Sequence, residues 1–286
     1  MMTTTRAAVR SVDGTEIAYE TIGSGRGLLV LGGAWRRGRD YRRLARELAP
    51  SFSVHLLDRR GRGDSGPQGA RYSIEREVED LQAVQQETGA RLVFGHSFGG
   101  LIAMEAARRS SAFTDVIAYE PGVSVAGSMP LAWLAPYREL LTAGDRRGAF
   151  AAMVRGAGGA PTALERMPLW YVKLILRVFI RGDSWRRVEP LLECALAEHE
   201  QVARVAEQPI DRYHEIDARV VLLGGAKSRL HFTTTVFDAI SAVIPNADSE
   251  LIPGLGHTGP DEQAPELVAA RVREHVLKAG PSALRR

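Results

Sequence analysis

The stretch from Arg91 to Leu101, RLVFGHSFGGL, decides the fold of this chain. Its apolar first half predicts a buried strand, and the small and apolar residues from Ser97 to Ala107 predict a helix. The Gly-x-Ser-x-Gly pattern between them predicts a sharp turn that strains the serine backbone and leaves little room for side chains at its two glycines. Such a turn exposes a serine hydroxyl at a helix N-terminus, where developing negative charge is stabilised. The alternative is a glycine-rich turn that only joins a strand to a helix.

Short aliphatic or β-branched runs, bounded by Gly, Asp or Pro, alternate with segments of helical period along most of the chain. This alternation is typical of parallel strands joined by helices, and fully apolar runs indicate a sheet covered on both faces. The predicted strands are Thr15–Ile22, Gly27–Gly33, Ser53–Arg59, Arg91–Gly95, Val116–Tyr119, Arg219–Leu223 and Ser249–Ile252. The sequence therefore predicts an α/β fold with a mostly parallel central sheet flanked by helices.

Residues 122–216 interrupt the alternation, because they contain no good strand and several helical stretches rich in aromatic residues. We interpret this segment as a helical cap domain inserted into a core domain made of residues 1–121 and 217–286. Within it, Leu169–Ile180 is apolar nearly all round, with a charged stripe that Lys173, Arg177 and Arg181 form at four-residue spacing. A lid helix has this pattern, and a helix lying on a membrane surface is the alternative.

The bulk composition is that of an ordinary soluble enzyme, with 45% hydrophobic and 25% charged residues among 286. The single cysteine, Cys194, excludes an internal disulfide, and no Cys/His spacing resembles a zinc site, so no metal is expected. Residues 1–10 lack the apolar stretch of a secretory signal, and no segment is apolar enough to span a membrane. These features favour a cytoplasmic protein without stable membrane insertion.

Nucleic-acid binding is not favoured by the charge pattern. The net charge is only +3, and the arginines are interleaved with acids and glycines. The densest basic run, Arg59 to Arg62, follows a predicted strand and is interpreted as part of a loop rather than as a nucleic-acid-binding patch.

Three stretches together resemble the α/β-hydrolase superfamily: Gly95–Gly100, Asp58–Gly66 with the letters DRRGRGDSG, and Gly254–His257 with the letters GLGH. The resemblance covers most of the chain outside residues 122–216. It implies the α/β-hydrolase fold and a serine nucleophile that needs no metal or organic cofactor. It also assigns the arginine run to a loop that shapes the site.

A serine hydroxyl needs a base within hydrogen-bond reach. Ser97 is the predicted nucleophile, and the resemblance implies His257 as the base, because it follows the last strand and precedes the last helix. Among the other histidines, His96 is expected to pack beside the elbow and His55 to lie in the core. His231 could approach the site from a loop.

The acid departs from the commonest family pattern, in which an Asp follows the penultimate strand. That stretch has no carboxylate here, and Ser228 stands roughly where the Asp would be. Glu120 ends the strand after the nucleophile and is followed by a proline, which resembles the branch that includes zearalenone lactonases. Carboxyl ends of parallel strands converge, so Glu120 is the predicted acid. The alternatives are Asp238, inside a predicted helix, and a surface or cap-anchoring function for Glu120.

The oxyanion hole is expected to use the backbone N–H groups of Phe98 and Ala34. Ala34 follows Gly32-Gly33, where the family usually has His-Gly. Trp35, Trp133 and Trp170 are candidates for lining the substrate pocket. The alternative for each of these aromatic residues is ordinary packing.

These features together predict hydrolysis of a carboxylic ester or lactone, with a hydrophobic small molecule as substrate, through Ser97, His257 and Glu120. The serine in the elbow argues against epoxide hydrolases and dehalogenases, whose similar motif carries an aspartate. An acyltransferase or thioesterase, a C–C bond hydrolase and a perhydrolase share the same residues. From another class, a non-catalytic ligand receptor is the alternative. The oligomeric state is not predicted.

Overall fold

The computed structural model describes residues 4–230 and 232–278. One eight-stranded sheet has the order β1-β2-β4-β3-β5-β6-β7-β8. β2 pairs antiparallel with β1 and β4, and every other pair of neighbours is parallel. The strands are β1 Thr4–Arg10, β2 Glu16–Ile22, β3 Arg26–Leu31, β4 Phe52–Leu57, β5 Leu92–His96, β6 Asp115–Tyr119, β7 Arg219–Gly225 and β8 Ala247–Ile252. The predicted α/β fold with a mostly parallel sheet is confirmed.

All seven predicted strands are present, and each observed end lies within two residues of the predicted one. β1 is not among the predicted strands, although it pairs along its whole length with β2 at the edge of the sheet. The side chains of β1 are exposed except that of Val9, which is half-buried. An edge strand of this kind has no apolar run, because its backbone pairing holds it rather than a buried face.

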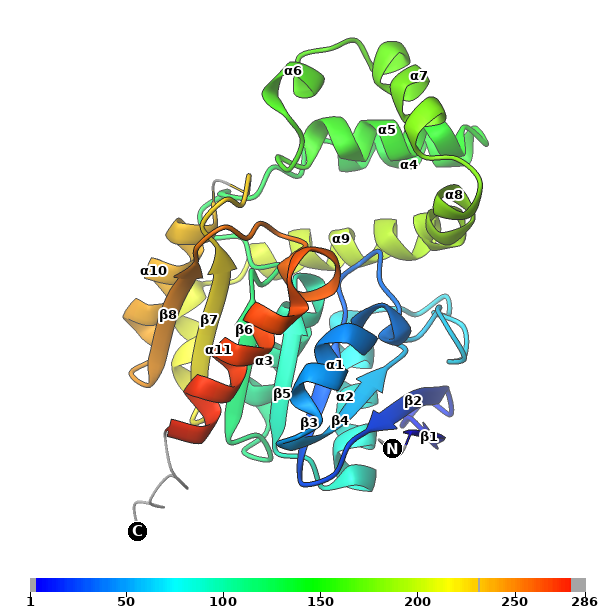
Figure 1. Cartoon of the computed structure of the whole chain (residues 1–286). Coiled ribbons are helices and arrows are strands. Elements are labelled where there is room, and N and C mark those ends of the chain that lie inside the picture. The colour runs from blue at the N-terminus through cyan, green and yellow to red at the C-terminus, as the bar shows by residue number, and fades with distance from the viewer. Residues whose placement is uncertain (1–3, 231, 279–286) are drawn as a thin grey trace.

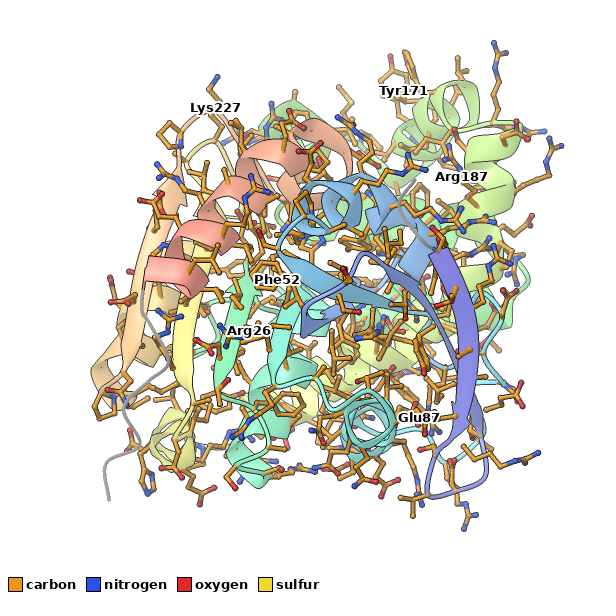
Figure 2. All side chains as sticks on the ribbon, turned by 60° about the horizontal axis from the view of Figure 1, so that its bottom comes forward. Arg26, Phe52, Glu87, Tyr171, Arg187 and Lys227 are labelled. Atoms are coloured by element: carbon orange, nitrogen blue, oxygen red, sulfur yellow. The ribbon has the colours of Figure 1, made fainter. Side chains whose placement is uncertain are left out.

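Helices cover both faces of the sheet (Figure 1). α1 (Arg42–Leu48) and α11 (Pro265–Lys278) pack against each other and share one apolar cluster with the strands. α2 (Ile74–Thr88), α3 (Phe98–Arg109) and α10 (Thr233–Val243) contribute to the second cluster. Figure 2 shows Phe52, which is fully buried at the start of β4.

Between β6 and β7 the chain forms helices only. They are α4 Leu134–Thr142, α5 Arg146–Gly156, α6 Thr162–Glu165, α7 Leu169–Phe179, α8 Asp183–Val188, η2 Glu189–Leu191, α9 Leu192–Ala206 and η3 Ile210–Glu215. Figure 1 shows α4 to α8 beyond the carboxyl ends of the parallel strands. A third apolar cluster lies among these helices, while α9 also contributes to the cluster on the sheet. No helix in the described ranges is long and apolar enough to cross a membrane.

The turn between β5 and α3 is unusually close. A Cβ on Gly95 would lie 2.3 Å from the carbonyl oxygen of Gly99, and one on Gly99 would lie 2.4 Å from that of Leu31. Ser97, between them, has φ 54° and ψ −119°, a backbone conformation that residues other than glycine rarely adopt. The glycines therefore allow the N-terminus of α3 to press against the ends of β3 and β5.

Replacement of Gly95 should destabilise the protein, because the new methyl group meets backbone rather than a movable side chain. We expect Gly95→Ala to lower the free energy of unfolding by about 1–3 kcal/mol or more, measured by urea denaturation. Gly159→Ala is the matched control, since Gly159 is exposed and its Cβ would meet only the side chain of Leu230 at 3.6 Å. Equal midpoints for the two variants would contradict this account of the elbow.

Candidate active site

Three predicted site residues follow parallel strands in one half of the sheet. Ser97 follows β5, Glu120 follows β6 and His257 follows β8. The carboxyl ends of these strands meet at one edge of the sheet. There the Nδ1 of His257 lies 2.7 Å from Oε2 of Glu120. The ring of His257 lies 4.7 Å, centre to centre, from that of His96, the residue before Ser97.

The backbone of Ser97 is held from two directions. Its N–H donates to the carbonyl of Tyr119 at 2.9 Å, and its own carbonyl accepts from the N–H groups of Gly100 and Gly122 at 2.8 Å each. Gly122 belongs to the loop that follows Glu120, so the same backbone bonds join the predicted nucleophile to the predicted acid. This arrangement limits movement of one relative to the other.

The carboxylate of Glu120 is buried, with 3% of the residue exposed, and accepts from three groups. Oε1 accepts from the backbone N–H of Gly225 at 2.8 Å. Oε2 accepts from the hydroxyl of Ser228 at 2.9 Å and contacts His257. Glu120 also has a positive φ of 42°, a strained conformation for a residue with a side chain.

In the sequence, Ser228 occupies the place of the usual acid. In the structure it is a hydrogen-bond donor to the acid on the neighbouring strand. The signal was a serine where the family has a carboxylate, combined with a glutamate one strand away. Asp238 lies inside α10, as expected, but its side chain is exposed and it is not among the groups around His257.

The loop that carries His257 is anchored beneath the histidine. Tyr119, at the end of β6, donates its hydroxyl to the carbonyl of Gly256 at 2.7 Å. The backbone N–H of Gly256 donates to Oε1 of Gln263 at 2.7 Å. Gly225 has no room for a side chain, since a Cβ there would lie 2.4 Å from the carbonyl of Leu255. The imidazole is thus carried on a rigid loop.

The two expected oxyanion donors lie beside the elbow. Phe98 is the first residue of α3, so its N–H has no partner within the helix. Gly33 passes close to the nucleophile, because a Cβ on it would lie 3.3 Å from Cβ of Ser97 and 3.8 Å from Oγ. Ala34, the next residue, is buried. The loop after β3 therefore reaches the nucleophile as the motif predicts.

His96 is buried and linked to this loop through Tyr41. The Tyr41 hydroxyl accepts from the N–H of Gly33 at 3.1 Å and lies 2.7 Å from Nδ1 of His96. Burial, and then the nearby His257, hold the pKa of His96 well below its usual range. His96 is therefore neutral, and its Nδ1 forms a hydrogen bond with the Tyr41 hydroxyl. This contact agrees with the packing function expected from the sequence.

The three aromatic pocket candidates lie in different environments. Trp35 is half-buried and packs edge-on against Phe150 of α5, with the two ring centres 5.8 Å apart. Trp133 is 5% exposed and lies inside the apolar cluster of the helices between β6 and β7, next to His199. Trp170 is 68% exposed on α7, beside Tyr171, which Figure 2 shows on the helical segment. Of the three, Trp35 lies nearest in sequence to the Gly33–Ala34 loop.

The described residues contain no cluster of three or more His, Cys, Asp or Glu side chains that could hold a metal ion. His231 lies outside the described residues.

The sheet order, the serine elbow and the His–Glu contact define the architecture of a hydrolase of the α/β class. A family model described as "Alpha/beta hydrolase family" matches residues 28–271, so the chain belongs to this family. The chain is also similar to a solved alpha/beta hydrolase from Sphaerobacter thermophilus, with a TM-score of 0.78 and 29% identity over 94% of this chain and 99% of that one.

Two curated relatives are similar over a shorter stretch. Lipase LipV of Mycobacterium tuberculosis is 36% identical over 104 residues, which are 35% of this chain and 39% of the relative. A pimeloyl-[acyl-carrier protein] methyl ester esterase of Chromobacterium violaceum is 40% identical over 90 residues, which are 32% of this chain and 34% of the relative. The matches thus span little more than a third of either relative.

The burial of His55 predicts how the stability of the folded protein changes with pH. Burial lowers the pKa of His55 to about 4, from 6.5. The unfolded chain therefore takes up this proton near pH 6.5, before the folded chain does, and the folded state loses stability as the pH falls from 7 to 5. We expect His55→Gln to reduce this loss by about 1–2 kcal/mol, measured by urea denaturation at both pH values.

His214→Gln, at an exposed position on η3, is the control and should leave the loss unchanged. An equal loss in wild type and His55→Gln would mean that His55 is protonated in the folded protein.

Proposed function

We propose that this protein is a serine hydrolase that cleaves a carboxylic ester or lactone through Ser97, His257 and Glu120. The single observation that carries the proposal is the 2.7 Å contact between Nδ1 of His257 and the buried Glu120, beside a serine elbow. In a neutral imidazole, the nitrogen that is hydrogen-bonded to a carboxylate carries the ring proton. Nδ1 of His257 is that nitrogen, which leaves Nε2 unprotonated and able to act as a base. This is the tautomer that activates a serine.

In the proposed reaction, Oγ of Ser97 attacks the substrate carbonyl carbon while Nε2 of His257 takes its proton. The N–H groups of Phe98 and Ala34 stabilise the oxyanion that forms. His257 then returns the proton to the leaving alkoxide, and the C–O bond breaks to give an acyl-enzyme. Water, deprotonated by the same imidazole, attacks the acyl-enzyme. The bond between the acyl carbon and Oγ of Ser97 then breaks, His257 returns its proton to Oγ, and the carboxylic acid is released. Glu120 orients His257 and stabilises the imidazolium.

The ester class is supported by the names of the two curated relatives, a lipase and a methyl ester esterase, within the limits of their partial matches. A lactone is an internal ester and needs the same chemistry. The acyltransferase or thioesterase function and the non-catalytic receptor are the alternatives. The set of Ser, His and buried acid favours catalysis over a receptor.

We also propose that residues 122–216 act as a cap domain over the site. This segment has its own apolar cluster, which includes Trp133, Tyr137, Phe150 and Leu176. The cytoplasmic location expected from the sequence remains part of the proposal.

The proposal is tested by hydrolysis of p-nitrophenyl esters and macrocyclic lactones. We expect Ser97→Ala to lower kcat by about 10³-fold or more and Glu120→Gln by about 10³–10⁴-fold. Asp238→Asn is the control for an acid outside the site and should keep the wild-type rate. Loss of activity in Asp238→Asn alone would overturn the acid assignment.

A fluorophosphonate probe separates the enzyme from the receptor. Rapid labelling of Ser97 in wild type, lost in Ser97→Ala, supports a nucleophile. A wild-type protein that binds esters without turnover and is not labelled would favour the receptor.

The contact between Ser228 and Glu120 predicts that a carboxylate at position 228 can replace that of Glu120 as the partner of His257. Oγ of Ser228 lies 2.9 Å from the oxygen that contacts His257, so a carboxylate there can reach the same imidazole. We expect Ser228→Asp, added to Glu120→Gln, to recover about tenfold or more of the lost kcat, since a charge beside the imidazole is restored. Glu120→Gln with Ser228→Asn is the uncharged control. Equal rates in both double variants would contradict the prediction.

A further inference from the structure

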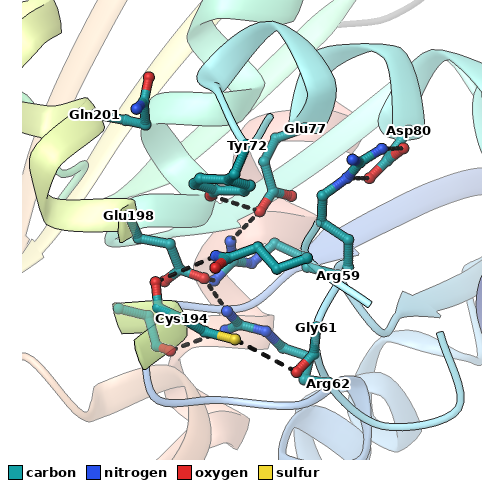
Figure 3. Close-up of polar contacts among 12 residues, drawn as sticks. Arg59, Gly61, Arg62, Tyr72, Glu77, Asp80, Cys194, Glu198 and Gln201 are labelled. Atoms are coloured by element: carbon teal, nitrogen blue, oxygen red, sulfur yellow. Dashed lines mark hydrogen bonds and ion pairs between the residues drawn. The ribbon is translucent and has the colours of Figure 1, made fainter. Parts of the chain in front are cut away.

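A buried cluster of charges lies between the core and the cap, and the proposed chemistry does not use it. Arg59 and Arg62, from the loop after β4, meet Glu77 of α2 and Glu198 of α9 (Figure 3). The side chains of all four are at most 1% exposed. Burial of charge is expensive unless each group is paired and hydrogen-bonded, so the fold retains this cluster at a cost.

The two arginines hold the loop that follows β3 by its carbonyl groups. Arg59 donates to the carbonyls of Gly32 and Gly33, at 3.1 Å each. Arg62 donates to those of Gly33 at 3.2 Å, Ala34 at 2.8 Å and Arg36 at 3.2 Å. The carbonyl of Gly33 thus accepts from both guanidinium groups.

This double contact fixes the direction of one N–H group. The carbonyl of Gly33 and the N–H of Ala34 belong to the same planar trans peptide, so they point in opposite directions. When the arginines draw the carbonyl to one side, the N–H of Ala34 must face the other. Ala34 is the residue expected to donate to the oxyanion, and the adjoining Gly33 lies beside Ser97.

Glu198 holds both arginines in place. Its Oε1 is ion-paired with Arg62 and lies 3.0 Å from NH2 of Arg59. Glu77 pairs with Arg59 only, at 2.7 Å. Burial, and then repulsion from Arg59, lower the pKa of Arg62 to about 10. Without the charge of Glu198, Glu77 would be the one carboxylate left to balance the two guanidinium groups in this cluster of four. Arg59 and Arg62 would then repel each other.

We propose that Glu198 is a positioning residue for the oxyanion hole: through Arg59 and Arg62, this residue of cap-linked helix α9 orients the Gly33–Ala34 peptide toward Ser97. The inference rests on the proposed function. It makes α9 part of the catalytic scaffold rather than only a support for the cap.

The neighbouring Arg60 provides a matched control. It is equally buried and lies in the same loop, but it pairs with Asp80 at 2.7 Å and Asp13 at 3.0 Å, and none of its hydrogen bonds in the described part of the chain goes to the loop after β3. Arg60→Lys disturbs a buried ion pair without touching the carbonyls of residues 32–36. It therefore separates loss of stability from loss of oxyanion positioning.

The experiment compares Glu198→Gln and Arg62→Lys with Arg60→Lys. Removal of a whole oxyanion donor lowers kcat by about 10²–10³-fold, so misdirection of one donor should lower kcat by about 10–100-fold. KM for a p-nitrophenyl ester should stay within about twofold, because the ground-state carbonyl depends little on this donor. Affinity for a trifluoromethyl ketone, which forms a charged tetrahedral adduct with a serine, should fall in proportion to kcat. Arg60→Lys should keep wild-type kcat whatever its urea midpoint.

A kcat that falls equally in all three variants, or a KM that rises with no change in kcat, would overturn the proposal. If Glu198→Gln does not fold, Arg62→Lys still tests the proposal. Lysine retains the positive charge but cannot hydrogen-bond to the carbonyls of Gly33, Ala34 and Arg36 at the same time.

A second readout distinguishes this inference from the proposed function. Amide hydrogen exchange of Gly33, which donates to Tyr41, and of Arg36, which donates to Gly33, reports on the loop without catalysis. Faster exchange of both amides in Glu198→Gln than in Arg60→Lys supports positioning even if wild type cleaves no ester. Unchanged exchange would contradict positioning even if Ser97 proves to be the nucleophile.

Discussion

The close approach of backbone to backbone at Gly95 and Gly99 is the constraint on which the rest of the site depends. With no Cβ at either position, the first turn of α3 packs directly against the carboxyl ends of β3 and β5. This contact forces Ser97 into its strained conformation and brings the Gly33–Ala34 loop beside it. It also leaves the N–H of Phe98 free at the helix N-terminus. The positions of the proposed nucleophile and of the proposed oxyanion donors therefore depend on one packing contact.

The acid illustrates how parallel strands share a site. Carboxyl ends of neighbouring strands lie close together, so a carboxylate can reach the imidazole from more than one of them. Here Glu120 does so from the end of β6. The last residue of β7 donates the N–H of Gly225 to it, and the loop after β7 donates the hydroxyl of Ser228. If Glu120 is the acid, as proposed, the two strand ends differ in function from the commonest family pattern. Glu120 has a positive φ, which is a strained backbone conformation for a residue with a side chain.

The buried arginines join the segment between β6 and β7 to the rest of the fold through one polar network. A purely structural loop could be held by apolar packing, which often stabilises as well as a buried ion pair does. Guanidinium groups instead hold carbonyl groups in a fixed direction, and a fixed direction is what the proposed oxyanion hole requires. Because Glu198 comes from α9, whose other residues pack against both the sheet and the apolar cluster of the helices between β6 and β7, that segment is tied to the loop beside Ser97.

The sequence by itself determined the fold class, because apolar runs and glycine turns are local signals. It placed all seven of the strands that have a buried face, and it located the Ser97 elbow, because that turn depends only on adjacent residues. It missed β1, whose exposed residues carry no apolar pattern. Only the tertiary structure decided the contacts of Glu120 with His257 and Ser228, and the pairing of Arg62 with Glu198. Those contacts join residues 108 to 137 positions apart, and local periodicity contains no information about such distances.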